Sequence, residues 1–251
     1  MSSTSPELVL APAKITLSLR VTGVRSDGMH LIDAEMITVD LFDEMLVGPG
    51  DGLEVVGASG LSVPADDDNL VRKALRLAGR SAHVLLTKRI PSGAGLGGGS
   101  ADAGAILRWA GFDDPVAAAA LGADVAFCMV GGRARVTGIG ELIEPLEYVE
   151  RTLTVLTPPL SCSTPAVYRA WDGMGGPRSD GPNDLEPAAL KVVPDLARGR
   201  DMLGDSTGET PILAGSGSTW FVHGSFPEAG VVVRSLPAGF ATGLAPTPGS
   251  P

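Results

Sequence analysis

Residues 91–104 read PSGAGLGGGSADAG, and five of the seven residues from Gly93 to Gly99 are glycine. Glycine loses more backbone freedom on folding than any other residue, so such a cluster lowers stability unless the loop serves a purpose. The preceding segment, HVLLTKRI (83–90), is short and rich in apolar and β-branched residues, which predicts a strand. In residues 100–111 small and apolar residues recur at helical spacing, and Gly111 is a typical stop signal.

The order strand, glycine loop, helix aims several backbone amides and a helix dipole at one point, which predicts a phosphate site. A Walker A loop is excluded because the expected helix begins GGSAD and has no lysine. A dinucleotide fingerprint, GxGxxG, matches Gly93, Gly95 and Gly98, but any glycine-rich loop contains one by chance. A flexible linker is disfavoured, because linkers rarely lie between two strongly periodic segments.

Composition limits the remaining choices. The chain of 251 residues is 44% hydrophobic with a mean hydropathy of +0.22, which is typical of a packed protein with one large or two modest domains. The net charge of −10 argues against a nucleic acid or an anionic membrane surface as partner. Neither a signal peptide nor an apolar run of membrane-spanning length is recognisable. Cys128 and Cys162 lack CxxC spacing, so we expect free thiols and a cytoplasmic location.

Strand and helix signals mix along the chain without a regular βαβ rhythm, which predicts an α+β fold. Strands are expected over 13–21, 34–41, 44–47, 83–90, 152–156 and 230–236, with a strand and turn in 131–140 and two strands around a glycine turn in 212–222. Helices are expected over 69–80, 100–111 and 114–121, from Thr164 onward, and weakly over 183–193. A soft boundary near Glu150 predicts domains at 1–150 and 151–245, followed by a disordered tail at 246–251.

Two ionisable residues stand out against their surroundings. Asp124 is a lone carboxylate among small and apolar residues, either a helix N-cap or turn residue or a general base for a hydroxyl group. Lys14 lies on the polar face of the strand expected at 13–21. It is either a solvated lysine or a cation that keeps Asp124 ionised and stabilises charge on a substrate oxygen. Only four of the nineteen basic residues are lysine, which draws attention to this one.

The glycine stretch at 91–101 resembles the Pro-x-x-x-Gly-Leu-Gly-Gly-[Gly/Ser]-Ser-[Ala/Ser] loop of the galactokinase, homoserine kinase and mevalonate kinase (GHMP) superfamily. The chain also resembles the cytidyl-diphosphate methylerythritol kinases, bacterial enzymes of the non-mevalonate isoprenoid route. This second resemblance rests on blocks that occur in the same order. They are APAKITLSLRVTGVRSDGMHLI (11–32), the glycine loop, LGADVAFCMVGGRARVTGIGE (121–141), STPAVYRAWD (163–172), NDLEPAA (183–189) and LAGSGSTWF (213–221).

The resemblance implies a two-domain GHMP kinase fold, with an N-terminal domain like domain 2 of ribosomal protein S5 and a C-terminal ferredoxin-like α/β sandwich. It implies transfer of the γ-phosphoryl group of ATP to the 2-hydroxyl of 4-diphosphocytidyl-2-C-methyl-D-erythritol. Asp124 would be the base and Lys14 its partner. Mg²⁺ would be held with the help of Ser100, and the protein would act on a small molecule as a monomer or homodimer.

Further site residues follow from the same resemblance. The implied nucleotide-binding residues are Asn69, Lys88, Pro91, Ser92, Gly93, Ala94, Gly95, Leu96, Gly97, Gly98, Gly99, Ser100 and Ala101. The implied substrate-binding residues are Thr16, Asp27, Met29, His30, Tyr168, Gly215, Ser216 and Gly217. Four of these assignments have structural alternatives, which are a helix N-cap for Asn69, an exposed strand-end cation for Lys88, a buried helix tyrosine for Tyr168 and a plain hairpin turn for 215–218.

Three positions depart from the family pattern. Met29 replaces a tyrosine, so one face of the expected cytosine sandwich is lost, while Thr16 replaces an asparagine and Ala126 a proline. The phosphoryl-transfer residues are unaffected, but a related kinase for another small alcohol stays open. A non-catalytic nucleotide-binding module is a third possibility, and NAD binding is a fourth.

Overall fold

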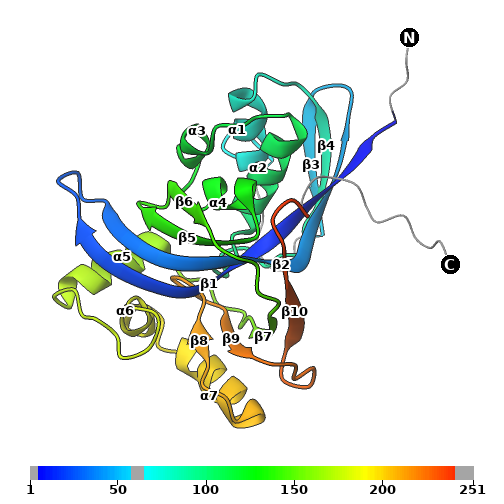
Figure 1. Ribbon diagram of the computed structural model, residues 1–251. Coiled ribbons are helices and arrows are strands. Elements are labelled where there is room, and N and C mark those ends of the chain that lie inside the picture. The colour runs from blue at the N-terminus through cyan, green and yellow to red at the C-terminus, as the bar shows by residue number, and fades with distance from the viewer. Residues whose placement is uncertain (1–4, 58–64, 241–251) are drawn as a thin grey trace.

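A computed structural model describes residues 5–57 and 65–240, so the tail expected at 246–251 lies outside the described residues. The strands are β1 Glu7–Val24, β2 His30–Gly48, β3 Gly52–Val56, β4 His83–Thr87, β5 Arg133–Gly138, β6 Leu142–Pro145, β7 Thr152–Leu156, β8 Ile212–Leu213, β9 Trp220–His223 and β10 Val231–Leu236 (Figure 1). The helices are α1 Leu70–Leu77, α2 Gly98–Trp109, α3 Pro115–Ala119, α4 Val125–Val130, α5 Thr164–Gly173, α6 Glu186–Val192 and α7 Leu196–Thr207.

The long antiparallel ribbon of β1 and β2 organises the molecule. Strand β2 also pairs with β4, β5 and β10, and β10 continues to β7, β9 and β8. Figure 1 shows α1 to α4 on one side of the ribbon, and β7 to β10 with α5 to α7 on the other. Only the β3–β4 pair is parallel among the described strand pairs, so the α+β prediction is confirmed. The domain boundary expected at residue 150 falls between β6 and β7 and stays a prediction.

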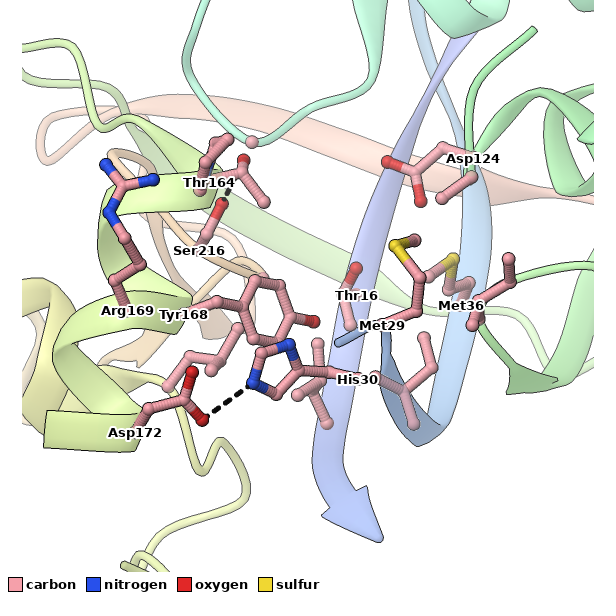
Figure 2. A pocket seen from close by; sticks show the side chains of 18 of the residues that line it. Thr16, Met29, His30, Met36, Asp124, Thr164, Tyr168, Arg169, Asp172 and Ser216 are labelled. Atoms are coloured by element: carbon pink, nitrogen blue, oxygen red, sulfur yellow. Dashed lines mark hydrogen bonds and ion pairs between the residues drawn. The ribbon is translucent and has the colours of Figure 1, made fainter. Parts of the chain in front are cut away.

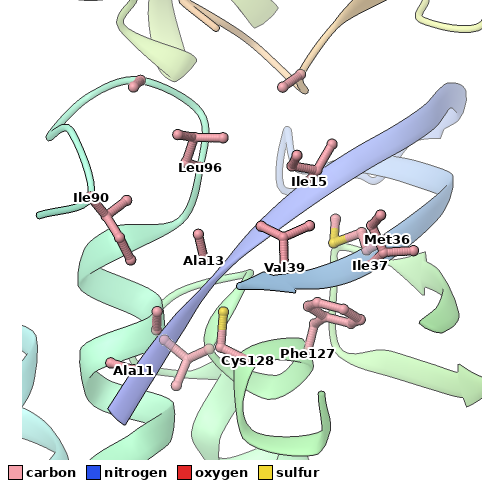
Figure 3. Packing of buried hydrophobic residues seen from close by; sticks show 14 of the residues in the cluster. Ala11, Ala13, Ile15, Met36, Ile37, Val39, Ile90, Leu96, Phe127 and Cys128 are labelled. Carbon is pink, nitrogen blue, oxygen red and sulfur yellow. The ribbon is translucent and has the colours of Figure 1, made fainter. Parts of the chain in front are cut away.

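Burial of β1 differs from the prediction of a half-exposed strand. Residues 11–17 are buried on both faces, and even Lys14 and Thr16 are only 4% and 2% exposed. Helices α2 and α4 pack against the strand, and the Lys14 amide donates to the Leu96 carbonyl at 3.0 Å. Figure 3 shows Leu96 of the glycine loop, Ile15 of β1 and Phe127 of α4, which belong to the same buried cluster. The face that looked solvated in the sequence is therefore covered by the glycine loop and the pocket beside it.

Other differences have similar causes. A single strand, β2, replaces the two expected over 34–41 and 44–47, because Asp43 interrupts the apolar pattern but lies buried inside the strand. Helix α4 was not predicted, since its six residues are apolar or small and show no polar face. The sequence also gave no indication of α7 or of the short strands β3 and β6.

Candidate functional site

A pocket of about 500 Å³ opens where β1, the glycine loop, α4, α5 and the turn after β8 meet (Figure 2). Segments far apart in the sequence supply its lining. The predicted residues that line it are Lys14, Thr16, Met29, His30, Gly95, Asp124, Tyr168, Gly215 and Ser216. Asp27 does not line it, and instead accepts a hydrogen bond from the Met29 amide at 3.1 Å, which shapes the turn before β2.

Lys14 and Asp124 meet in the lining of this pocket. Their Nζ and Oδ2 atoms lie 3.2 Å apart, and Nζ also donates to the Thr16 hydroxyl at 3.1 Å. Asp124 occupies the N-cap position of α4, but its side chain makes no capping hydrogen bond. Its carboxylate is 31% exposed, so it remains accessible while the ammonium is buried. The structure therefore contradicts the solvated lysine, and it places Asp124 at the N-cap position without the hydrogen bond that a capping side chain would make.

The glycine loop has the conformation that an anion site requires. Gly93, Gly95 and Gly97 have φ values of 71°, 80° and 70°, in the left-handed region that glycine adopts at little cost. Helix α2 begins at Gly98, two residues earlier than predicted. Among the described residues, none of the consecutive amides from Gly95 to Ser100 donates a hydrogen bond to a protein acceptor. These unpartnered amides at a helix start form a nest for a negatively charged group.

A second glycine turn, at residues 214–218, lies close against the glycine loop. A Cβ added at Gly95 would lie 2.5 Å from the Ala214 oxygen, and one added at Gly215 would lie 3.7 Å from Lys14 Nζ. The side-chain amide of Asn183 donates to the Leu213 and Gly215 carbonyls at 2.8 and 2.7 Å, which fixes the turn. The turn connects the antiparallel strands β8 and β9, so the hairpin interpretation is confirmed, and Gly215 and Ser216 line the pocket, while their role in substrate binding stays a prediction.

At the other end of the pocket, aromatic rings gather around His30. The His30 and Tyr168 ring centroids are 4.5 Å apart, which leaves no room for a third ring between them. Burial, reinforced by the nearby Asp124 charge, raises the pKa of Tyr168 to about 12, so its phenol stays protonated at neutral pH. Met29, where the family pattern has tyrosine, is 45% exposed at the pocket edge.

Sequence reasoning missed three polar lining residues of α5, namely Thr164, Arg169 and Asp172. Residues three and four apart share a helix face, so the positions 164, 168 and 172 could have been recognised from the helical register. Arg169 matters most for charge, since the structure gives its guanidinium no ion pair or hydrogen bond among the described residues.

A smaller pocket of about 220 Å³ lies on the other side of the α2 start and is lined by Asn69, Lys88, Ser92, Gly99 and Asp102, among others. Asn69 caps α1 by accepting from the Val71 amide at 2.9 Å, so the N-cap interpretation is confirmed. Lys88 is not an exposed strand-end cation, because it is 5% exposed and pairs with two buried carboxylates, Asp43 and Asp102. The pKa of Lys88 is raised even though burial opposes it, because the two carboxylates outweigh the burial.

This triad predicts an unusual pH dependence of stability. Burial raises the pKa of Asp102 from 3.8 to about 7 against the attraction of Lys88, and its Oδ1 has no hydrogen-bond partner. A carboxyl group whose folded pKa is raised stabilises the fold most below about pH 4, and that contribution is lost as pH rises to about 7. Asp102→Asn should therefore gain stability relative to the wild type between pH 4 and 7, with an upper limit of about 1.4 kcal/mol per pH unit.

The measurement is the free energy of unfolding in urea at several pH values for both proteins. Taking the difference between them cancels the titration of the groups that do not interact with Asp102. A difference that does not change with pH, or that changes in the opposite direction, would show that Asp102 is ionised throughout this range.

Neither a cluster of metal-ligating His, Cys, Asp or Glu side chains nor a membrane-spanning helix occurs in the part of the chain that is described. No group of three or more His, Cys, Asp or Glu side chains within 5–57 and 65–240 could hold a metal ion. None of the described helices combines the length and the apolar character needed to cross a bilayer. The Ser100 hydroxyl has no protein hydrogen-bond partner among the described residues, so it is available to a ligand in the glycine loop.

Comparisons with known proteins agree with this geometry. The model of the GHMP kinases N terminal domain matches residues 69–132, which include the glycine loop and Asp124. A relative from Paracoccus denitrificans, named 4-diphosphocytidyl-2-C-methyl-D-erythritol kinase, is 38% identical over 231 residues, 84% of each chain. A relative of the same name from Ruegeria pomeroyi is 36% identical and covers 90% of this chain and 91% of its own length.

Two solved structures of kinases are also similar to this chain. A crystal structure of 4-(cytidine 5'-diphospho)-2C-methyl-D-erythritol kinase is 31% identical, with a TM-score of 0.72, and covers 91% of this chain and 98% of its own. A homoserine kinase from Cytophaga hutchinsonii shares the fold at a TM-score of 0.59 and 19% identity, covering 95% of this chain and 96% of its own.

Proposed function

The chain belongs to the 4-diphosphocytidyl-2-C-methyl-D-erythritol kinases of the GHMP kinase superfamily, and we propose that it uses Lys14 and Asp124 to phosphorylate the 2-hydroxyl of that substrate. It is an ATP-dependent kinase of non-mevalonate isoprenoid biosynthesis. The observation that supports the residue assignment is the 3.2 Å ion pair of Lys14 and Asp124 between a nest of unpartnered amides and a large pocket.

Phosphoryl transfer depends on positioned phosphates, nearby positive charge and a group that takes the proton of the attacking hydroxyl. We assign the positioning of the phosphates to the amides of Gly95 to Ser100, which would hold the phosphates of ATP. The carboxylate of Asp124 would accept the hydroxyl proton, and the Lys14 ammonium, 3.2 Å from it, would stabilise negative charge on the attacking oxygen. The small pocket beside Asn69 and Lys88 would receive the nucleoside end of ATP.

Mg²⁺ fits the chemistry of this loop. Magnesium usually keeps several waters and takes one or two protein oxygens together with phosphate oxygens, so no dedicated ligand cluster is needed. We propose Ser100 as a protein ligand, because its hydroxyl lies in the first turn of α2 without a protein partner among the described residues. When bound, the ion would neutralise charge on the phosphates.

The acceptor would occupy the large pocket in an extended pose. Its erythritol end would lie at Lys14, Thr16 and Asp124, and its cytosine at Met29, His30 and Tyr168. Gly215 and Ser216 of the pocket lining, with the adjacent Gly217 and the unpaired guanidinium of Arg169, would hold the diphosphate between them. Because His30 and Tyr168 pack against each other, the base would stack on one ring and would not enter a sandwich of these two.

Transfer of radiolabel from the γ-phosphate of ATP tests the function directly. With Mg²⁺, the purified protein should label 4-diphosphocytidyl-2-C-methyl-D-erythritol and should leave mevalonate, homoserine and galactose nearly unlabelled. A preference for one of these other alcohols would instead support the related-kinase alternative raised by Met29 and Thr16. Slow ATP hydrolysis that no acceptor changes would indicate a non-catalytic nucleotide-binding module.

We propose that the protein works in a reducing compartment. The two cysteines, Cys128 and Cys162, are buried and unpaired, which supports a reducing compartment such as the cytoplasm. The net charge of −10 supports a small molecule and not a nucleic acid as the partner. We keep the monomer and the homodimer as the expected oligomeric states.

A further inference from the structure

The imidazole of His30 is held from three sides by residues of one helix, α5. Its Nε2 lies 2.8 Å from Oδ1 of Asp172, its face packs on Tyr168 at 4.5 Å, and the Trp171 ring meets it edge-on at 5.8 Å. The three contacts join the start of β2 to the pocket face of α5. They fix both the position of the ring and the direction in which each ring nitrogen points.

The carboxylate partner decides which ring nitrogen carries a proton. An ionised carboxylate only accepts hydrogen bonds, so Nε2 of His30 must be the N–H donor in this contact. In the neutral imidazole the other nitrogen, Nδ1, is then a bare acceptor. Nδ1 has no hydrogen-bond partner among the described residues, and Figure 2 shows it on the side of the ring away from Asp172, in the pocket lining.

We propose that Asp172 is a positioning residue that fixes the Nε2–H tautomer of His30, and that the chain thereby selects a cytosine over a uracil base. This inference rests on the proposed function. The exocyclic amino group of cytosine is a donor and suits the bare Nδ1, whereas uracil presents a carbonyl oxygen at the same place. Two acceptors facing each other lose a hydrogen bond and repel, which is an effective means of discrimination.

Two features of the site support this role over a purely structural one. The Asp172 side chain is 47% exposed, so the fold does not depend on its burial, while the His30 side chain is only 12% exposed. Asp172 also lies one helical turn after Tyr168, so a single helix face presents the stacking ring and the carboxylate together. Asp172 is thus poised to act on the base through His30 and not by touching the reacting atoms.

The first test is the tautomer of His30 by long-range ¹H–¹⁵N NMR at about pH 8.5, where a free imidazole is neutral. The wild type should show a protonated Nε2 and an unprotonated Nδ1, with the signal assigned by its absence in His30→Gln. Asp172→Ala should give a mixture of the two tautomers. A wild-type ring protonated at Nδ1, or an unchanged tautomer in Asp172→Ala, would overturn the proposal.

The second test is steady-state kinetics with the cytidine acceptor and its uridine counterpart. The wild type should prefer the cytidine compound by at least about 100-fold in kcat/KM, and Asp172→Ala should reduce this preference about tenfold or more. The loss should appear as a higher KM with kcat within about twofold, because Asp172 does not touch the reacting group. Asp172→Glu should restore part of the preference, since it keeps a carboxylate.

A matched control makes the same chemical change elsewhere. Asp201→Ala, at an exposed ion pair with Arg200 outside the pocket, should leave both KM and base preference unchanged. An unchanged cytidine preference in Asp172→Ala would overturn the specificity role even if the tautomer shifts. Wild-type protein that phosphorylates neither acceptor would overturn the kinase assignment together with the base selectivity, while the NMR result would still decide whether Asp172 fixes the ring.

Discussion

Replacement of Asp124 by asparagine should lower kcat by about 10²–10⁴-fold and leave ATP affinity within about twofold, because the amide cannot accept the hydroxyl proton. Asparagine has nearly the same shape, and the aspartate side chain makes no capping hydrogen bond that the change would remove. The unpartnered amides of the glycine loop are also unaffected. Single-turnover phosphoryl transfer and calorimetric ATP binding measure the two quantities separately.

The control for this experiment is Asp113→Asn, the same substitution at an exposed position before α3 that does not line the large pocket. Its kcat should equal that of the wild type. Near-normal turnover in Asp124→Asn would show that Asp124 is not the base. A parallel loss of ATP binding would instead show that the substitution disturbs the glycine loop, and would leave the ion pair with Lys14 as a structural contact.

Gly95→Ala should abolish ATP binding and turnover together. Gly95 has φ +80°, and an added Cβ would lie 2.5 Å from the Ala214 oxygen and 2.8 Å from the Gly217 oxygen. Both atoms belong to the backbone of the second glycine turn, which the side chain of Asn183 holds in place. The first loop must therefore move away and break the alignment of its amides. We expect the overpacking to lower the free energy of unfolding by about 1–3 kcal/mol as well.

Gly111→Ala separates backbone strain from the clash. Gly111 lies just after α2 with φ +72°, but an added Cβ there would meet nothing within 4 Å. This variant should lose about 1–2 kcal/mol of stability from the left-handed conformation alone and keep normal kinetics. Equal ATP affinities in the two alanine variants, measured by calorimetry, would contradict the close approach of the two glycine turns.

The glycine loop and its flanking elements could be predicted because their signals are local. Apolar residues at strand spacing, a run of glycines and apolar residues at helical spacing are each encoded within about a dozen residues. The structure accordingly has β4, the loop and α2 where they were expected, within three residues at their ends. The mixture of elements likewise gave the α+β class, and the ordered motifs pointed to the family that the relatives confirm.

Burial and partners could not be predicted, since they depend on what packs against each residue. Of the two interpretations of Lys88, the exposed strand-end cation is wrong, because Asp43 and Asp102, which lie 45 and 14 residues away in sequence, enclose it. The alternation in β1 placed Lys14 on a solvated face, although the glycine loop covers that face. In the same way, the role proposed for Asp172 depends on a contact with His30 across 142 residues.

The sequence by itself determined the local elements, the phosphate-binding character of the loop and the family, because glycine content and residue spacing carry that information directly. Only the tertiary structure decided that the ammonium of Lys14 and the carboxylate of Asp124 meet at 3.2 Å beside that loop. The reason is physical: the distance between residues 110 positions apart is set by how α2, α4 and the glycine loop pack on β1, and no local pattern specifies it.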